Sequence, residues 1–61
     1  MKPIEQIVEE INKYHQKWEV PEEWYISEET GRVYRRSELD GQLVRIKMND
    51  ARSYYNRYVK K

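Results

Sequence analysis

The stretch WYISEETGRVYRRSELDGQLVRIKM, residues 24–48, decides the fold because two turn signals separate its short apolar runs. In residues 28–31, Glu-Glu-Thr-Gly, the glycine tolerates the positive φ that closes a bulged hairpin turn, and Asp40-Gly41 is typical of a two-residue hairpin loop. Residues 43–48 alternate between apolar and basic with the period of a strand. We therefore expect three antiparallel strands, at about residues 24–28, 32–38 and 42–48.

Pairing across these turns sorts the strand residues onto two faces. It places Tyr25 opposite Tyr34 in the first hairpin and Arg35 opposite Ile46 in the second. One face is apolar and collects Trp24, Ile26, Val33, Val44, Ile46 and Met48. The other face collects Tyr25, Tyr34, Arg36, Leu43, Arg45 and Lys47. Arg35 falls on the apolar face, where it fits only if it lies at an edge of the sheet.

Helical patterns flank the strands on both sides. The first is a stripe of residues at helical spacing, namely Ile4, Ile7, Val8, Ile11, His15 and Trp18. Pro3 is suited to the first turn of a helix, and Pro21 is expected to stop the helix. We therefore expect a helix at about residues 3–18. The second stripe consists of Ala51, Tyr54, Tyr55, Tyr58 and Val59. Asn49-Asp50 supply its expected N-cap, which predicts a helix at about residues 50–60.

Each helix has one apolar stripe and the sheet has one apolar face, so we expect both helices to pack on that face. The sequence thus predicts an α+β fold of order α-β-β-β-α, a single domain over residues 1–61 with a three-stranded antiparallel sheet. A chain of 61 residues buries only about 60% of the surface that its unfolded chain exposes, and it has no cysteine to add a disulfide. We expect Trp18 and Trp24 to fill the thin core together beneath the sheet.

The charges are sorted along the chain. Residues 1–30 contain eight acidic and three basic residues, a net charge of −5, whereas residues 31–61 contain three acidic and nine basic residues, a net charge of +6. A basic half that carries tyrosines is typical of a surface that binds nucleic acid or an acidic protein. The candidate binding surface comprises Tyr25, Tyr34, Arg36, Arg45, Lys47, Arg52, Arg57 and Lys60.

Two other interpretations of this surface are open. Alternating Arg, Lys and Tyr are equally typical of a solvated strand face that resists edge pairing. Alternatively, acidic side chains of the first half fold over the cations, and the two halves neutralise one another. The acids expected in that case are Glu5, Glu9, Glu22 and Glu23.

The sequence contains few histidine or cysteine side chains, which act as nucleophiles or as metal ligands. Its one histidine is His15, on the apolar stripe, and there is no cysteine. We therefore expect a buried, hydrogen-bonded His15, no enzymatic activity, no bound metal and no cofactor. No apolar run approaches the roughly 20 residues of a membrane span, and the first residues do not resemble a secretory signal. We expect a soluble protein without a membrane partner, cytoplasmic if natural, and monomeric with a homodimer as the alternative.

Residues 21–34, PEEWYISEETGRVY, resemble the opening of a WW domain, in which a Trp begins the first strand and Gly-Arg-x-Tyr the second. Arg35 stands where that family has a second Tyr, and the third-strand Trp and the closing Pro are absent. The resemblance therefore implies a shared hairpin and not a proline-rich ligand. The element order is similar to that of double-stranded-RNA-binding domains, but their Lys-Lys-x-x-Ala opening of the last helix is replaced here by Asn49-Asp50-Ala51-Arg52-Ser53, which argues against RNA binding.

The agreement of turns, caps and ion-pair spacing with one fold resembles the local consistency of computationally designed mini-proteins. That resemblance implies a stable, non-enzymatic scaffold or binder. The alternative is a small natural protein of the phage-inhibitor type. Such a protein would bind nucleic acid or inhibit a partner through the tyrosine and arginine sheet face and the basic last helix.

Overall fold

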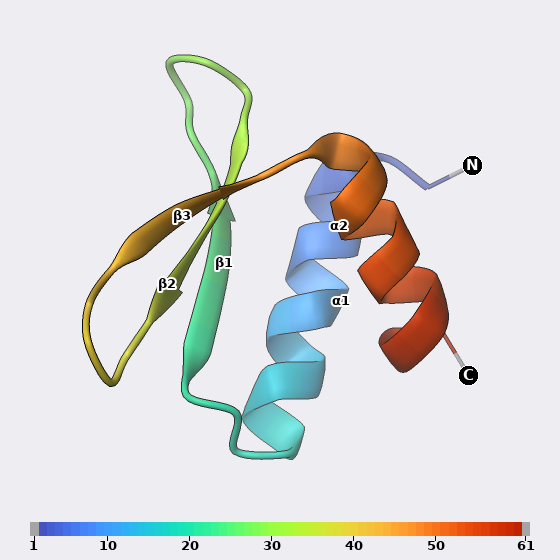
Figure 1. Ribbon diagram of the computed structural model, residues 1–61. Helices are drawn as coiled ribbons and strands as arrows, with labels where there is room; N and C mark the ends of the chain where they lie inside the picture. Colours follow the sequence, from blue (N-terminus) through green and yellow to red (C-terminus); the bar gives the residue numbers. More distant parts are fainter. Residues whose placement is uncertain (1, 61) are drawn as a thin grey trace.

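The computed structural model describes residues 2–60 and consists of one sheet beside two helices (Figure 1). The elements are, in chain order, α1 (Ile4–Lys17), β1 (Glu22–Ile26), β2 (Val33–Ser37), β3 (Leu43–Ile46), α2 (Met48–Tyr54) and the π-helical turn η1 (Tyr55–Val59). The strands form one antiparallel sheet in the order β1-β2-β3. The predicted α+β class and the predicted element order are confirmed.

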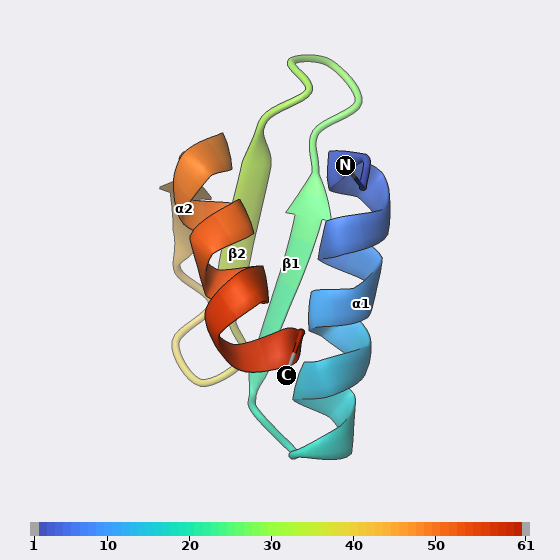
Figure 2. The ribbon, with the colours of Figure 1, turned by 90° about the vertical axis from the view of Figure 1, so that its right-hand side faces the viewer.

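Both helices lie on the same side of the sheet, as Figures 1 and 2 show. α1 packs against β1, and α2 with η1 packs against α1. Among the elements of residues 2–60, none covers the other side of the sheet, which we call the open face. The buried apolar core consists of Ile7, Val8, Ile11, Trp24, Val33, Ala51 and Tyr55.

The two hairpins close with the same turn. Residues 27–31 read Ser-Glu-Glu-Thr-Gly, and residues 37–41 read Ser-Glu-Leu-Asp-Gly. In each turn the glycine N–H donates to the serine carbonyl oxygen at 2.8 Å. Gly31 has a φ of 72° and Gly41 a φ of 69°, a conformation that glycine adopts without steric strain from a Cβ atom.

This shared turn corrects the predicted register of the second hairpin. Tyr25 lies opposite Tyr34, as predicted, but Arg35 lies opposite Val44 and not opposite Ile46. The second turn is longer than the two-residue loop expected at residues 40–41, and the pairing therefore moves by two residues. Because side chains alternate with a period of two, this shift leaves every strand residue on its predicted face.

α1 ends in a Schellman turn. The N–H of Val20 donates to the carbonyl oxygen of His15 at 2.8 Å, and the N–H of Glu19 donates to that of Gln16 at 3.3 Å. Glu19 has a φ of 56°, in the left-handed region that favours glycine. This turn ends the helix at Lys17, close to the predicted end at residue 18, and Pro21 follows at a position where a helix cannot continue.

The end of α1 also corrects the predicted core. Trp24 is 3% exposed and lies in the core, whereas Trp18 is 62% exposed. Trp18 is the C-cap residue of α1, and its backbone, with a φ of −99° and a ψ of 9°, has left the helical conformation that carries the apolar stripe. Trp24 therefore fills the core with Tyr54 as its aromatic neighbour, and their ring centroids are 4.9 Å apart.

α2 begins at Met48, earlier than predicted. Its N-cap is Lys47, which makes no side-chain cap hydrogen bond, and Asn49 and Asp50 lie within the first helical turn. The predicted Asn49-Asp50 cap is therefore wrong, although Asp50 still places a negative charge at the positive end of the helix dipole. After α2 the helix continues as the π-helical turn η1, in which the N–H of Lys60 donates to the carbonyl oxygen of Tyr55, five residues earlier, at 2.9 Å.

Arg35 lies on the helix-covered face of β2, which is the middle strand. The expectation that this cation fits on the apolar face only at an edge of the sheet is therefore wrong. Its Nη1 donates to Oε1 of Glu22 at 3.2 Å, and the same oxygen accepts from Nε1 of Trp24 at 3.1 Å. The guanidinium and the indole N–H thus share one carboxylate at the rim of the core. This ion pair explains how a cation is accommodated on an otherwise apolar face.

Candidate functional site

The open face of the sheet carries a pair of tyrosines. The strand register places Tyr25, Tyr34 and Arg45 in one row across the three strands. The two tyrosine rings stack across the strands, with centroids 6.0 Å apart and an interplanar angle of 27°. Tyr25 is exposed and Tyr34 is half-buried. The row therefore presents two accessible aromatic rings beside a guanidinium group.

The next row of the open face holds Glu23, Arg36 and Leu43. Nη2 of Arg36 lies 3.6 Å from Oε1 of Glu23, and the exposed pair is screened by solvent. Among residues 2–60, no carboxylate oxygen lies within 4.0 Å of the charged nitrogens of Arg45 or Lys47. These two cations can therefore meet an external anion without breaking an ion pair.

The three predicted cations of the last helix lie elsewhere, because α2 and η1 cover the opposite face of the sheet (Figure 2). Nη1 of Arg52 donates to the carbonyl oxygen of Lys2 at 3.1 Å, and the guanidinium of Arg57 lies 5.8 Å from the ring centroid of Tyr58. The structure thus divides the predicted binding surface between the two sides of the sheet. Those on or beside the open face are Tyr25, Tyr34, Arg36, Arg45 and Lys47, and those on the opposite side are Arg52, Arg57 and Lys60.

The acidic first half meets the basic second half at β1 and β2. Glu22 pairs with Arg35 at 3.2 Å, next to the Glu23 ion pair on the other face. Glu9 instead pairs within its own helix, at 3.3 Å, and Glu5 makes no ion pair within 4.0 Å in the described part of the chain. The two halves therefore neutralise one another along one strand pair, and β3 keeps its positive charge.

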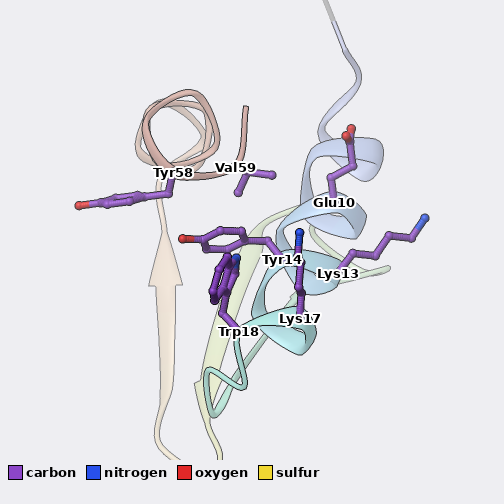
Figure 3. Close-up of a pocket in the computed structure, with 7 residues that line it drawn as sticks. All are labelled: Glu10, Lys13, Tyr14, Lys17, Trp18, Tyr58 and Val59. Carbon is purple, nitrogen blue, oxygen red and sulfur yellow. The ribbon is translucent and has the colours of Figure 1, made fainter. Parts of the chain in front are cut away.

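A second candidate site is an open cleft of about 500 Å³ between α1 and η1 (Figure 3). Its aromatic wall is formed by Tyr14 and Trp18, with ring centroids 6.5 Å apart, and Tyr58 lies across from them. Nζ of Lys17 lies 5.6 Å from the Trp18 ring centroid. The sequence places Trp18 and Tyr58 on buried stripes and so misses this cleft. The full lining is Glu10, Lys13, Tyr14, Lys17, Trp18, Tyr58 and Val59.

His15 is buried and hydrogen-bonded, which confirms its predicted place in the core. Its Nε2 lies 2.7 Å from the hydroxyl oxygen of Tyr54, whereas its Nδ1 is buried without a hydrogen-bond partner in residues 2–60. Burial lowers the pKa of His15 below its usual value, and the carboxylate and backbone of Glu22 oppose that shift. Burial also raises the pKa of Tyr54. Both shifts favour the neutral form of the side chain, and the hydrogen bond lies at the border of the core, where Tyr54 is half-buried.

A polar cluster joins the N-terminal segment to η1. Nζ of Lys2 lies 2.6 Å from the hydroxyl oxygen of Tyr55 and 3.1 Å from Oε2 of Glu10. The hydrogen bond from Lys2 lowers the pKa of the Glu10 carboxyl, and the bonds to Tyr55 and Glu10 raise the pKa of Lys2. These contacts tie the segment before α1 to the middle of α1 and to η1.

Among residues 2–60, no group of three or more His, Cys, Asp or Glu side chains is arranged to hold a metal ion. Within the same residues, no helix is both long and apolar enough to cross a membrane. Comparison with protein families, curated proteins and solved structures found no match to the chain.

Proposed function

We propose that this chain is a non-enzymatic binding module that recognises an acidic partner protein through the open face of its sheet. The observation that carries the proposal is the position of Arg45, which lies in the same row as the stacked tyrosines and has no carboxylate partner in residues 2–60. Lys47, which directly follows β3, also has no carboxylate partner within these residues. Tyrosine and arginine are enriched where protein interfaces gain most of their affinity. The exposed Leu43 in the next row adds apolar area, which favours a protein as the partner.

A second candidate partner is single-stranded nucleic acid, which the stacked Tyr25 and Tyr34 rings favour. Bases stack on accessible aromatic rings while cations beside them neutralise phosphates. A strand that follows the open face meets Arg36, Arg45 and Lys47, but not the cations of the last helix. Its affinity should therefore depend on salt as expected for about three phosphate contacts.

Both candidates are tested by titrating isotope-labelled protein with a short acidic peptide and, separately, with a single-stranded oligothymidylate. Amide chemical shifts are followed at low and moderate salt. We expect the peptide to shift the amides of Tyr25, Tyr34 and Arg45, and the double variant Tyr34→Ala, Arg45→Ala to bind at least about tenfold more weakly. Arg57→Ala is the matched control, because it removes an exposed cation on the other side of the sheet.

Binding of the oligonucleotide but not of the peptide would replace the proposal by the second candidate. Binding of neither probe would contradict both, and so would binding that the double variant leaves unchanged. The interpretation supported by those outcomes is a stable scaffold without a partner for this face, as the resemblance to designed mini-proteins implies.

A further inference from the structure

The two edges of the sheet differ in how their backbone groups are satisfied. On β1, the side-chain amide of Asn12 donates from Nδ2 to the carbonyl oxygen of Trp24 at 2.7 Å, and its Oδ1 accepts from the N–H of Trp24 at 2.9 Å. The amide thus occupies both outward backbone groups of the central residue of β1, as a neighbouring strand would. The β1 edge is thereby closed at its centre by a neutral side chain of α1.

The β3 edge has no such cover. The N–H of Ser27 donates to the carbonyl oxygen of Arg32, and the N–H of Glu38 donates to that of Pro21. Arg32 and Glu38 flank β2, and ladder bonds recur at every second residue. The even-numbered residues of β2 therefore bond to β1. Because ladder bonds alternate in an antiparallel sheet, the odd-numbered residues of β2 bond to their partners on β3, Val44 and Ile46.

The peptide groups of the remaining β3 residues, Leu43 and Arg45, therefore point away from the sheet. Within residues 2–60, no side chain or other backbone segment donates to or accepts from these groups. A strand edge in this state can accept a further strand.

Exposed apolar side chains gather around this open edge. Leu43 is 52% exposed on the open face, and Val44 is 37% exposed on the helix-covered face. Leu39 in the preceding turn and Met48 at the start of α2 are exposed as well. The edge therefore offers unpaired backbone groups, apolar contacts on both faces and the two cations that lack an acidic partner.

We infer that β3 is a docking edge to which an extended acidic segment of a partner protein adds as a fourth strand. This inference rests on the proposed function and specifies how the partner is held. On the open face, acidic side chains of the added strand would lie next to Arg45 and Lys47. On the other face, its apolar side chains would contact Val44 and Met48. Backbone hydrogen bonds supply affinity in this mode, and alternate side chains supply specificity.

Charge decides between such a partner and a second copy of this chain. Pairing of two β3 edges would bring together two basic halves, each with Arg45 and Lys47 lacking an acidic partner in residues 2–60. Like charges on neighbouring strands are unfavourable, whereas opposite charges stabilise the pairing. The acidic strand is therefore the occupant that the edge selects.

The test uses three capped peptides of alternating Glu and Val: an unmodified peptide, one methylated on the Glu backbone nitrogens, and one methylated on the Val backbone nitrogens. In antiparallel addition, residues on the open face form the hydrogen-bonded pairs with Leu43 and Arg45, so the Glu N–H groups face β3. We expect Glu methylation to weaken binding about tenfold or more and Val methylation to have little effect. The unmodified peptide should also slow hydrogen exchange at the amides of Leu43 and Arg45.

Equal binding of all three peptides, lost in the Tyr34→Ala, Arg45→Ala variant, would overturn the strand addition and leave the open-face function intact. Absence of binding by every peptide would overturn both. Sedimentation of the protein alone provides an independent check. Concentration-dependent dimers that dissociate in the variant Val44→Lys would show that a second copy occupies the edge, which would also overturn the inference.

Discussion

Replacing Trp24 by alanine tests the packing of the core most directly. The indole is 3% exposed, its ring centroid lies 4.9 Å from that of Tyr54 and 6.1 Å from that of His15, and its N–H donates to Glu22. Truncation of a buried aromatic side chain costs about 3–5 kcal/mol. A single core of this size supplies about 3–5 kcal/mol in total. We therefore expect Trp24→Ala to be largely unfolded at 25 °C by far-ultraviolet circular dichroism.

Trp18→Ala is the matched control, since it removes the same side chain from a site that is 62% exposed. The ring contacts Lys17 and Tyr14, and an exposed cation–π contact contributes about 0.5–1 kcal/mol. Urea denaturation should therefore show a loss below about 1 kcal/mol. Trp24→Phe should lose less stability than Trp24→Ala, because it retains an aromatic ring in the core and loses the hydrogen bond and only part of the buried ring volume. If both alanine variants lose equal stability, the assignment of Trp18 to the surface is wrong.

Two further predictions concern the end of α1 and the buried histidine. Glu19→Gly should raise the free energy of unfolding by about 0.5–1 kcal/mol, because glycine relieves the cost of a φ of 56°; a lower urea midpoint would contradict this. Because burial lowers the pKa of folded His15, the unfolded chain takes up the proton first, and stability should decrease as the pH falls below about 6.5. His15→Gln should reduce this slope in urea titrations across that range, and an unchanged slope would show that other groups cause it.

The faces of the sheet could be predicted from the sequence, whereas the register of its second hairpin could not be predicted from alternation alone. A shift of two residues keeps Arg35 and Val44 on the same face, so the side-chain pattern is equally consistent with both registers. The information lies in the turns. The repeated Ser-Glu-x-x-Gly of residues 27–31 and 37–41 indicates that both hairpins use one turn, and this repeat outweighs the general preference of Asp-Gly for a two-residue loop.

The helical spacing of apolar residues does not predict burial correctly at the C-terminal end of α1 or in η1, and the reason differs between the two. Helical spacing assigns Trp18 to the buried stripe, but the Schellman turn at Glu19 ends the helix and leaves the indole in solvent. Tyr58 is also exposed, because η1 is a π-helical turn and its side chains depart from the spacing of an α-helix. Both exposed rings line the same cleft (Figure 3), so this site arises from backbone geometry that an apolar stripe cannot reveal.

The two edges of the sheet differ in charge as well as in backbone hydrogen bonding, and this difference relates the basic second half of the chain to the fold. Asn12 closes the β1 edge with neutral hydrogen bonds, so this edge needs no charge to resist pairing. At β3 the backbone is open, and in the proposed mode Arg45 and Lys47 would disfavour pairing with a second copy. Positive charge that repels an identical edge attracts an acidic one by the same Coulomb interaction. If the edge binds an acidic strand as proposed, we expect added salt to weaken peptide binding and to favour self-association, because salt screens both the attraction and the repulsion.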